Sequence, residues 1–251
     1  HLAALNSDTP LIKYLVEHGA NVNTTSPVNK SILECAMFQE DGALERVKYL
    51  VENGASVKGQ DGALLLAAEG GSLEMVKYLV QHGANVNVTD SYKTTPLHYA
   101  AIKGRSPEVV NYLLEQGANV NATNYTGDTP LLHATYNDTI EIVKSLVEHG
   151  ANINIKSTDD SGTTPLIRAI QAEKTSPEMI TYLIEQGANV NAFNNEGETP
   201  LDAAIMFKPE MITYLIEQGA DVNATHGDGE TPLLQLAAQG NLAMLKHLVK
   251  H

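Results

Sequence analysis

The sequence contains no tryptophan, and its aromatic residues together make up only 5%. A single large core filled with aromatic side chains is therefore not expected. Long apolar runs are missing as well, since no stretch approaches the roughly 18 residues of a membrane-spanning helix. Residues 1–4 do not have the basic segment and apolar stretch of a signal peptide. We therefore expect a cytoplasmic protein without a membrane partner, or one in a host cytosol if it is a secreted effector.

Cysteine and basic residues are also scarce. The single cysteine, Cys35, cannot form an internal disulfide, which fits a reducing compartment, and we interpret it as a small core residue. Lysine and arginine number 16 against 30 acidic residues, and the formal net charge is −14. So few cations to neutralise phosphates argue against nucleic acid as a direct partner. The acidity favours a basic partner, although its simpler effect is to keep the chain soluble.

What the sequence does contain is an internal repeat. A segment of the form Gly-Ala-Asn-Val-Asn returns roughly every 33 residues. Its glycines are Gly19, Gly54, Gly83, Gly117, Gly150, Gly187 and Gly219. Each of them can end a helix, because glycine readily adopts the left-handed conformation of a helix C-cap. The pattern predicts successive similar units rather than one non-repetitive core.

The start of most units is marked too. The trio Thr-Pro-Leu supplies a capping hydroxyl and places proline at the first helical position, where its missing N–H does no harm. It begins at Thr95, Thr129, Thr164, Thr199 and Thr231. A second helix follows in each unit, and Ser-Pro-Glu at Ser106 and Ser176 marks two of its starts. The sequence therefore predicts a pair of helices in each unit.

In this form the repeat resembles the ankyrin repeat, and Thr95–Ala101 is the fullest match, with the sequence Thr-Pro-Leu-His-Tyr-Ala-Ala. The resemblance covers the chain as a single domain, 1–251. It implies an all-α solenoid of helix-turn-helix repeats with short β-hairpin fingers, whose fingers and first helices line a concave side. The expected repeats are 1–23 (partial), 24–57, 58–87, 88–121, 122–154, 155–191, 192–223 and 224–251 (partial).

Several repeats depart from this pattern. The third lacks Thr-Pro and is shorter between residues 57 and 63, so we expect its finger to be stunted or missing. The second has Ser31 in place of threonine, and Thr9 is predicted to open the second helix of the first repeat. Both ends interrupt a repeat and leave apolar residues such as Leu2 and Leu248 without neighbours, so we expect more repeats or another domain to flank the sequence.

We expect no enzyme activity, metal, cofactor or small-molecule substrate. Three histidines precede a helix-ending glycine, a place that suits a cation at a helix C-terminus: His18, His82 and His149. They lie one repeat or more apart, which is too far for them to share a metal ion. Carboxylates such as Asp159 and Glu198 fall on predicted finger tips in solvent. Solvent gives neighbouring carboxylates similar pKa values, so they are not expected to act as an acid–base pair. There is no phosphate-binding glycine loop after a strand and no nucleophile elbow.

The tyrosines divide into two groups. Six share one place in the second helix, and we interpret them as a packing ladder between repeats: Tyr14, Tyr49, Tyr78, Tyr112, Tyr182 and Tyr214. The other four fall on fingers or first helices, where we predict contact with a partner protein: Tyr92, Tyr99, Tyr125 and Tyr136. Lys103, Asn137 and Arg168 are predicted polar neighbours. Met206 and Phe207 hold the equivalent positions in the seventh repeat, and either extend this surface or belong to the core.

The leading hypothesis is a monomeric, non-enzymatic protein-interaction module that binds a partner protein on its concave face. One alternative is a targeting or substrate-recruiting segment of a larger enzyme, toxin or effector whose catalytic domain lies outside this chain. Another is a purely structural spacer. The segment 215–223 also resembles sites of asparaginyl hydroxylation in ankyrin repeats, which makes Asn223 a candidate for modification; the simpler interpretation is that Asn223 ties one loop to the next.

Overall fold

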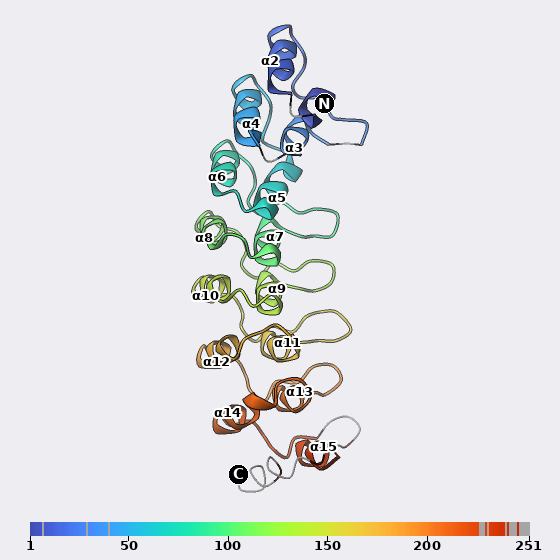
Figure 1. Cartoon of the computed structure of the whole chain (residues 1–251), viewed down its shortest axis with the longest axis vertical. Coiled ribbons are helices and arrows are strands. Elements are labelled where there is room, and N and C mark those ends of the chain that lie inside the picture. The colour runs from blue at the N-terminus through green and yellow to red at the C-terminus, as the bar shows by residue number, and fades with distance from the viewer. Residues whose placement is uncertain are drawn as a thin grey trace. The chain divides into compact units, whose positions relative to one another are not determined.

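The computed structural model describes residues 1–6, 8–28, 30–39, 41–225, 229, 231–238, 240 and 245. The chain divides into two compact parts, an N-terminal unit, His1–Asn119, and a C-terminal unit, Val120–His251. Each unit consists of helix pairs that are joined by short turns and separated by longer loops (Figure 1). Within the described residues, no helix is long and apolar enough to cross a membrane.

In the N-terminal unit the first helices of the pairs form one row and the second helices form another (Figure 1). The first helices are α1 (Leu2–Leu5), α3 (Ile32–Ala36), α5 (Asp61–Gly70) and α7 (Pro96–Lys103). The second helices are α2 (Thr9–Glu17), α4 (Ala43–Glu52), α6 (Leu73–Gln81) and α8 (Pro107–Glu115). Neighbouring first helices touch one another, most extensively α5 and α7.

The C-terminal unit repeats this arrangement. Its first helices are α9 (Pro130–Tyr136), α11 (Pro165–Gln171), α13 (Pro200–Phe207) and α15 (Pro232–Ala238). Its second helices are α10 (Ile140–Glu148), α12 (Pro177–Glu185) and α14 (Ile212–Glu217), the last preceded by the 3-10 turn η1 (Pro209–Met211). The predicted all-α helix-pair architecture is confirmed in both units.

The helices begin where their capping residues predict. The hydroxyl of Thr164 accepts a hydrogen bond from the N–H of Ile167 at the start of α11. Ser31 caps α3 in the same way, within a capping box that Glu34 completes. Thr9 opens the second helix of the first repeat, as expected, although the cap itself is the carboxylate of the preceding residue, Asp8.

The core of each unit lies between its two rows of helices. Each second helix after α2 has one fully buried leucine there: Leu50, Leu79, Leu113, Leu146, Leu183 and Leu215. Small residues of the first helices, such as Ala101 and Ala134, are also fully buried and let neighbouring helices approach closely. Cys35 belongs to this core, and burial raises the pKa of its thiol. Each repeat therefore buries its apolar side mainly against its neighbours.

The fingers are loops with little strand pairing. In the fifth repeat the N–H of Asn124 donates to the carbonyl of Asp128 at 3.1 Å, and its side-chain Oδ1 accepts from the N–H groups of Thr126 and Asp128. Asp90, Asp159 and Asn194 hold their fingers in the same manner. Within the described residues the β pairing is one isolated bridge, Thr25–Ser31. The expected hairpins are thus shaped by a polar side chain at the root rather than by a ladder.

The third repeat has no finger, as its shortened sequence predicts. The N–H of Gln60 donates to the carbonyl of Val57 at 3.1 Å, which makes a tight turn, and α5 begins at the next residue. Gly59 adopts a φ of 81° in this turn, a conformation that glycine allows at little cost.

An asparagine at the end of most repeats joins each repeat to the next. Asn154 shows the arrangement, because its Nδ2 donates to the carbonyl of Gly187 at 3.1 Å and its Oδ1 accepts from the N–H of Asn189 at 2.7 Å. The same two hydrogen bonds are made by Asn23, Asn87, Asn121 and Asn191. Lys58, the residue directly after the second repeat, occupies this place, so the second and third repeats lack this amide link.

The tyrosines of the second helices are half-buried, except Tyr14 in the first repeat, which is 57% exposed. A lysine of the preceding repeat lies over four of these rings, and Lys77 Nζ is 5.7 Å from the centre of the Tyr112 ring. The other such pairs are Lys13 with Tyr49, Lys48 with Tyr78, and Lys144 with Tyr182. The packing ladder between repeats is therefore also a series of cation–π contacts.

Candidate functional site

Exposed large apolar side chains gather on one face of each unit. We call this the first-helix face, and it consists of the first helices, the fingers before them and the turns after them. Outside α2, every exposed large apolar residue in the described part of the chain lies on this face: Leu2, Val28, Phe38, Leu66, Tyr92, Tyr125, Tyr136, Phe193, Met206, Phe207, Leu233 and Leu234. The second helices α4, α6, α8, α10, α12 and α14 expose none. An apolar surface confined to one face is typical of an interaction surface.

Tyr92 and Tyr99 lie together in the finger and first helix of the fourth repeat. Tyr92 is 70% exposed, whereas Tyr99 is half-buried and its hydroxyl donates to Asp90 Oδ2 at 2.9 Å. Burial, together with this hydrogen bond, raises the pKa of Tyr99 to about 12. Burial also raises the pKa of Asp90, but hydrogen bonds from Thr94, Tyr99 and Tyr92 outweigh it and leave that pKa below its usual value. Tyr99 therefore holds the finger that presents Tyr92.

In the C-terminal unit, Tyr125 and Tyr136 are 65% and 59% exposed. Tyr136 ends α9, and with the neighbouring Asn137 it borders a cleft of about 280 Å³ whose other side is Ala172, Glu173 and Lys174. The Nδ2 of Asn137 donates to the carbonyl of His133 at the end of the same helix. The structure thus places Tyr136 and Asn137 on one accessible edge of this unit.

Arg168 borders a second cleft beside Tyr136, but its charge is used within the protein. Its Nη1 lies 2.9 Å from Asp128 Oδ1, and its Nη2 lies 3.7 Å from Asp159 Oδ2. Its side chain is only 18% exposed. Arg168 therefore fixes two neighbouring fingers to α11, and it offers less charge to a partner than its sequence position predicts.

Met206 and Phe207 are exposed by 62% and 50%, which places them on the surface rather than in the core. They end α13, and the short η1 turn follows after Lys208. The two residues thus add to the first-helix face of the C-terminal unit.

The finger carboxylates are less solvent-exposed than the sequence predicts. Glu198 is half-buried, and this burial raises its pKa even though Asn194 and Gln171 donate hydrogen bonds to it. Burial raises the pKa of Asp159 as well, but hydrogen bonds from Ser161, Ser157 and Gly162 outweigh it and lower that pKa overall. Glu198 thus joins its finger to α11 of the preceding repeat, whereas the hydrogen bonds of Asp159 lie within its own finger.

The helix-ending histidines are also used locally. The Nδ1 of His82 lies 2.8 Å from the carbonyl oxygen of Tyr78, one turn earlier, and His18 and His149 make the same contact. Among the described residues, no group of three or more His, Cys, Asp or Glu side chains is placed to hold a metal ion. Asn223 is exposed and its N–H donates to Asp221 Oδ1; the next loop lies outside the described residues.

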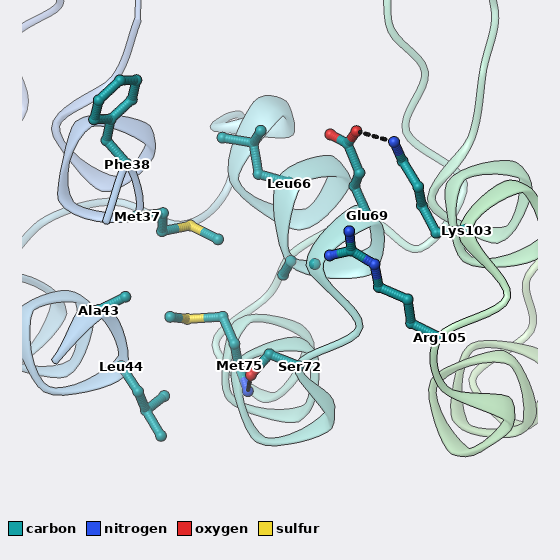
Figure 2. Close-up of a pocket in the computed structure, with 12 residues that line it drawn as sticks. Met37, Phe38, Ala43, Leu44, Leu66, Glu69, Ser72, Met75, Lys103 and Arg105 are labelled. Carbon is teal, nitrogen blue, oxygen red and sulfur yellow. Dashed lines mark hydrogen bonds and ion pairs between the residues drawn. The ribbon is translucent and has the colours of Figure 1, made fainter. Parts of the chain in front are cut away.

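The sequence pattern did not predict a groove in the N-terminal unit that has a volume of about 460 Å³. Figure 2 shows its apolar side, where the side chains of Met37 and Met75 point into the space and Leu66 and Phe38 stand beside it. Lys103 lies at the opposite end, 3.1 Å from Glu69, with Arg105 next to them. Of these residues only Lys103 was a predicted contact.

The groove results from unequal helix lengths. Helix α3 has 5 residues and its neighbour α5 has 10, so the C-terminal half of α5 has no helix beside it on that side. The turn after α3 takes this place and carries Met37 and Phe38. Leu66 and Glu69 of α5 therefore border an open space instead of a packed helix.

The turn after α3 is held by Arg46, which is only 2% exposed. Its guanidinium donates to the carbonyls of Ala36, Gln39 and Asp41 at 2.9, 2.6 and 2.6 Å. Burial lowers the pKa of this group, although the nearby Asp41 partly offsets the effect. One buried cation thus satisfies three carbonyls that a longer α3 would have bonded itself.

Family models match most of the chain. Models described as ankyrin repeats in three copies match residues 58–124, 122–194 and 155–226. A model described as ankyrin repeats in many copies matches residues 32–80, and a single ankyrin repeat model matches residues 1–27.

Several curated proteins are similar over part of their length. Putative ankyrin repeat protein FPV244 of fowlpox virus is 35% identical over 100 residues, which are 40% of this chain and 15% of that protein. Human protein phosphatase 1 regulatory subunit 27 is 40% identical over 69 residues, 28% of this chain and 42% of that protein. Intracellular phospholipase A2 of Caenorhabditis elegans is 38% identical over 66 residues, 25% of this chain and 6% of that protein. The match thus spans less than half of each relative.

A solved structure is similar over a larger share. It is a chain in the complex of the predatory endopeptidase Bd0816 from Bdellovibrio bacteriovorus with the immunity protein Bd3460. The identity is 34% and the TM-score 0.65, covering 75% of this chain and 97% of that chain. The repeated helix pairs and the family models agree on one conclusion: this chain belongs to the ankyrin repeat family.

Proposed function

We propose that this chain is a non-catalytic protein-interaction module that binds a partner protein through its first-helix face. The observation that carries the proposal is the distribution of apolar surface. Exposed large apolar residues lie on fingers, first helices and the turns after them, while the second helices after α2 expose none among the described residues. Solubility alone would not confine such residues to one face.

The chemistry of the exposed residues supports protein binding. Tyr92, Tyr125 and Tyr136 present large rings with few rotatable bonds, and such residues are enriched among the anchors of protein interfaces. The fingers that carry Tyr92 and Tyr125 are held by side-chain hydrogen bonds before any partner arrives. A surface that is already ordered loses less conformational entropy on association.

The names of similar proteins are in keeping with this role. One is a regulatory subunit of a phosphatase, and another comes from a complex of an endopeptidase with an immunity protein. Each of those names implies an interaction with another protein.

Affinity capture with matched variants tests the proposal. The bait chain is used as wild type, as Tyr92→Ala/Tyr125→Ala/Tyr136→Ala, and as Tyr14→Ala, which removes an exposed tyrosine from a second helix. We expect wild type and Tyr14→Ala to retain the same partner from lysate, and the triple variant to lose it, since a true anchor contributes about 1 kcal/mol or more. Equal retention by all three baits would remove the assignment of this face.

A further inference from the structure

We propose that the groove of the N-terminal unit binds a peptide segment of a partner protein that places a large apolar side chain next to a carboxylate. This inference rests on the function proposed above and names the chemistry that one part of the first-helix face selects. It is carried by three observations: an apolar wall, a cation without an ion pair, and a turn that is fixed in advance.

The apolar wall accepts a large side chain of a partner. Met37 and Met75 point into the groove, Phe38 is 68% exposed at its edge and Leu66 is 37% exposed on α5 (Figure 2). A volume of about 460 Å³ falls within the range of sites that bury a ligand group. Methionine side chains are flexible and polarizable, so the same wall fits apolar side chains of different shape.

The opposite end of the groove selects a negative charge. Glu69 pairs with Lys103 at 3.1 Å and thereby offsets its charge, whereas Arg105 is exposed and has no ion pair among the described residues. A guanidinium binds a carboxylate through two parallel hydrogen bonds, which suits Asp, Glu or a chain terminus. The net charge of −14 disfavours a second whole copy of this chain as the occupant, whereas a short peptide meets the local positive charge of Arg105.

The wall is in place before a ligand binds. Arg46 holds the turn that carries Met37 and Phe38 through three carbonyls, and Gly42 lets it do so. A Cβ at Gly42 would lie 3.2 Å from Arg46 Nη1, and the φ of 68° there disfavours other residues. A groove with a fixed wall binds a short peptide with a smaller ordering cost than a mobile loop.

The test uses a displayed library of random dodecapeptides selected on the whole chain. We expect the enriched peptides to share a Leu, Ile, Met or Phe next to Asp or Glu. One such peptide, synthesised with a fluorophore, is then titrated by anisotropy. Arg105→Glu and Phe38→Ala should each weaken its binding about tenfold, because a paired charge and an aromatic contact are lost. Lys13→Glu, which reverses an exposed cation of the second helix α2, should leave the affinity unchanged.

A double-mutant cycle makes the carboxylate assignment specific. Replacing the acidic residue of the peptide by its amide should weaken binding to wild type, but not weaken binding to Arg105→Gln any further. Phe38 and Arg105 are both exposed, and the melting temperature of each variant checks that the protein still folds.

Two results would overturn the inference. A library that enriches no apolar–acidic pair would do so, as would a peptide whose affinity ignores both Arg105 and Phe38. If Tyr92→Ala or Tyr136→Ala abolishes binding of such a peptide instead, the assignment of the peptide to the groove is wrong, while the proposed function stands. If the library yields no such peptide and all three baits above capture the same partner equally, both the groove and the proposed function are contradicted.

Discussion

The guanidinium Nη1 of Arg168 lies 2.9 Å from Oδ1 of Asp128, which joins α11 to the finger root of the preceding repeat. Asp128 is 8% exposed and its Oδ2 accepts from Thr126, while Arg168 supplies the nearest positive charge. Arg168→Met leaves the Asp128 carboxylate buried without the guanidinium. We therefore expect the free energy of unfolding to fall by about 3 kcal/mol in urea denaturation. Arg105→Met is the control, since it removes an exposed arginine without an ion pair among the described residues and should cost less than about 0.5 kcal/mol. Equal losses would contradict this role for Arg168.

Tyr99 gives the protein a stability change at alkaline pH. Its pKa is about 12 in the folded chain and about 10 in an unfolded one, so folding favours the neutral hydroxyl. This contribution is complete below pH 10 and is lost as the pH rises to 12. Tyr99→Phe should lower the free energy of unfolding by about 1 kcal/mol at pH 7, with a smaller difference at pH 11. Tyr92→Phe, whose ring is exposed, should match wild type at both pH values.

Glu198 has the opposite effect on stability near neutral pH. Burial raises its pKa in the folded chain above the unfolded value, so the ionised form opposes folding. The cost of ionising Glu198 in the folded chain is absent below its pKa in the unfolded chain, about 4.3. This cost grows as the pH rises through its pKa in the folded chain. Glu198→Gln keeps an acceptor for Asn194 and Gln171, and should raise the urea midpoint at pH 7 but not at pH 3.5. A gain of the same size at both pH values would show that charge is not the cause.

Gly127 is required where two fingers meet. Its φ is 74°, and a Cβ there would lie 2.1 Å from Thr158 Oγ1 and 2.3 Å from the backbone nitrogen of Thr158. Gly127→Ala therefore adds a backbone clash to the strain of a left-handed residue, and we expect a loss of about 2 kcal/mol or more. Gly150→Ala isolates the strain, because Gly150 has a φ of 86° with nothing near its Cβ. Similar melting temperatures for the two variants would refute the clash.

The helix pairs could be predicted because their signals are local. A threonine cap, a proline after it and a glycine at the end act within a few residues, and α11 starts and α12 ends where Thr164 and Gly187 predict. The fingers were harder to predict, since their shape depends on carboxylates and amides such as Asp159 that bond inside the loop. A polar residue in a loop gives no sign in the sequence of whether it faces solvent.

The candidate site was only partly predictable for a related reason. Tyr92 and Tyr136 could be predicted as exposed, because their places in the repeat face away from the neighbouring helices. The pairing of Arg168 with Asp128 could not, since the partner comes from another repeat. The groove was missed because it depends on the short α3 and on Arg46, which reads in sequence as one more polar residue of an amphipathic helix.

Lys58 offers a stabilising substitution. Lys58→Asn supplies the amide that Asn23 and Asn154 use to bond the following loop, here at Gly83 and Asn85. Two exposed hydrogen bonds should raise the free energy of unfolding by about 1 kcal/mol, read from the urea midpoint. Lys58→Ala, which removes the lysine without adding an amide, should show no gain. If both variants gain equally, loss of the lysine side chain explains the effect.

The loop at Lys58 also has a consequence for how the N-terminal unit opens. In a stack held by nearest neighbours, a junction with fewer bonds separates before the others do. Residues ahead of Lys58 are joined to those behind it by the α3–α5 contact and by the Lys48–Tyr78 cation–π contact, but not by an amide. Helix α3 is the shortest helix at such a junction after α1. The junction after the second repeat is therefore the one expected to separate first on unfolding, and the groove between Phe38 and Arg105 crosses it.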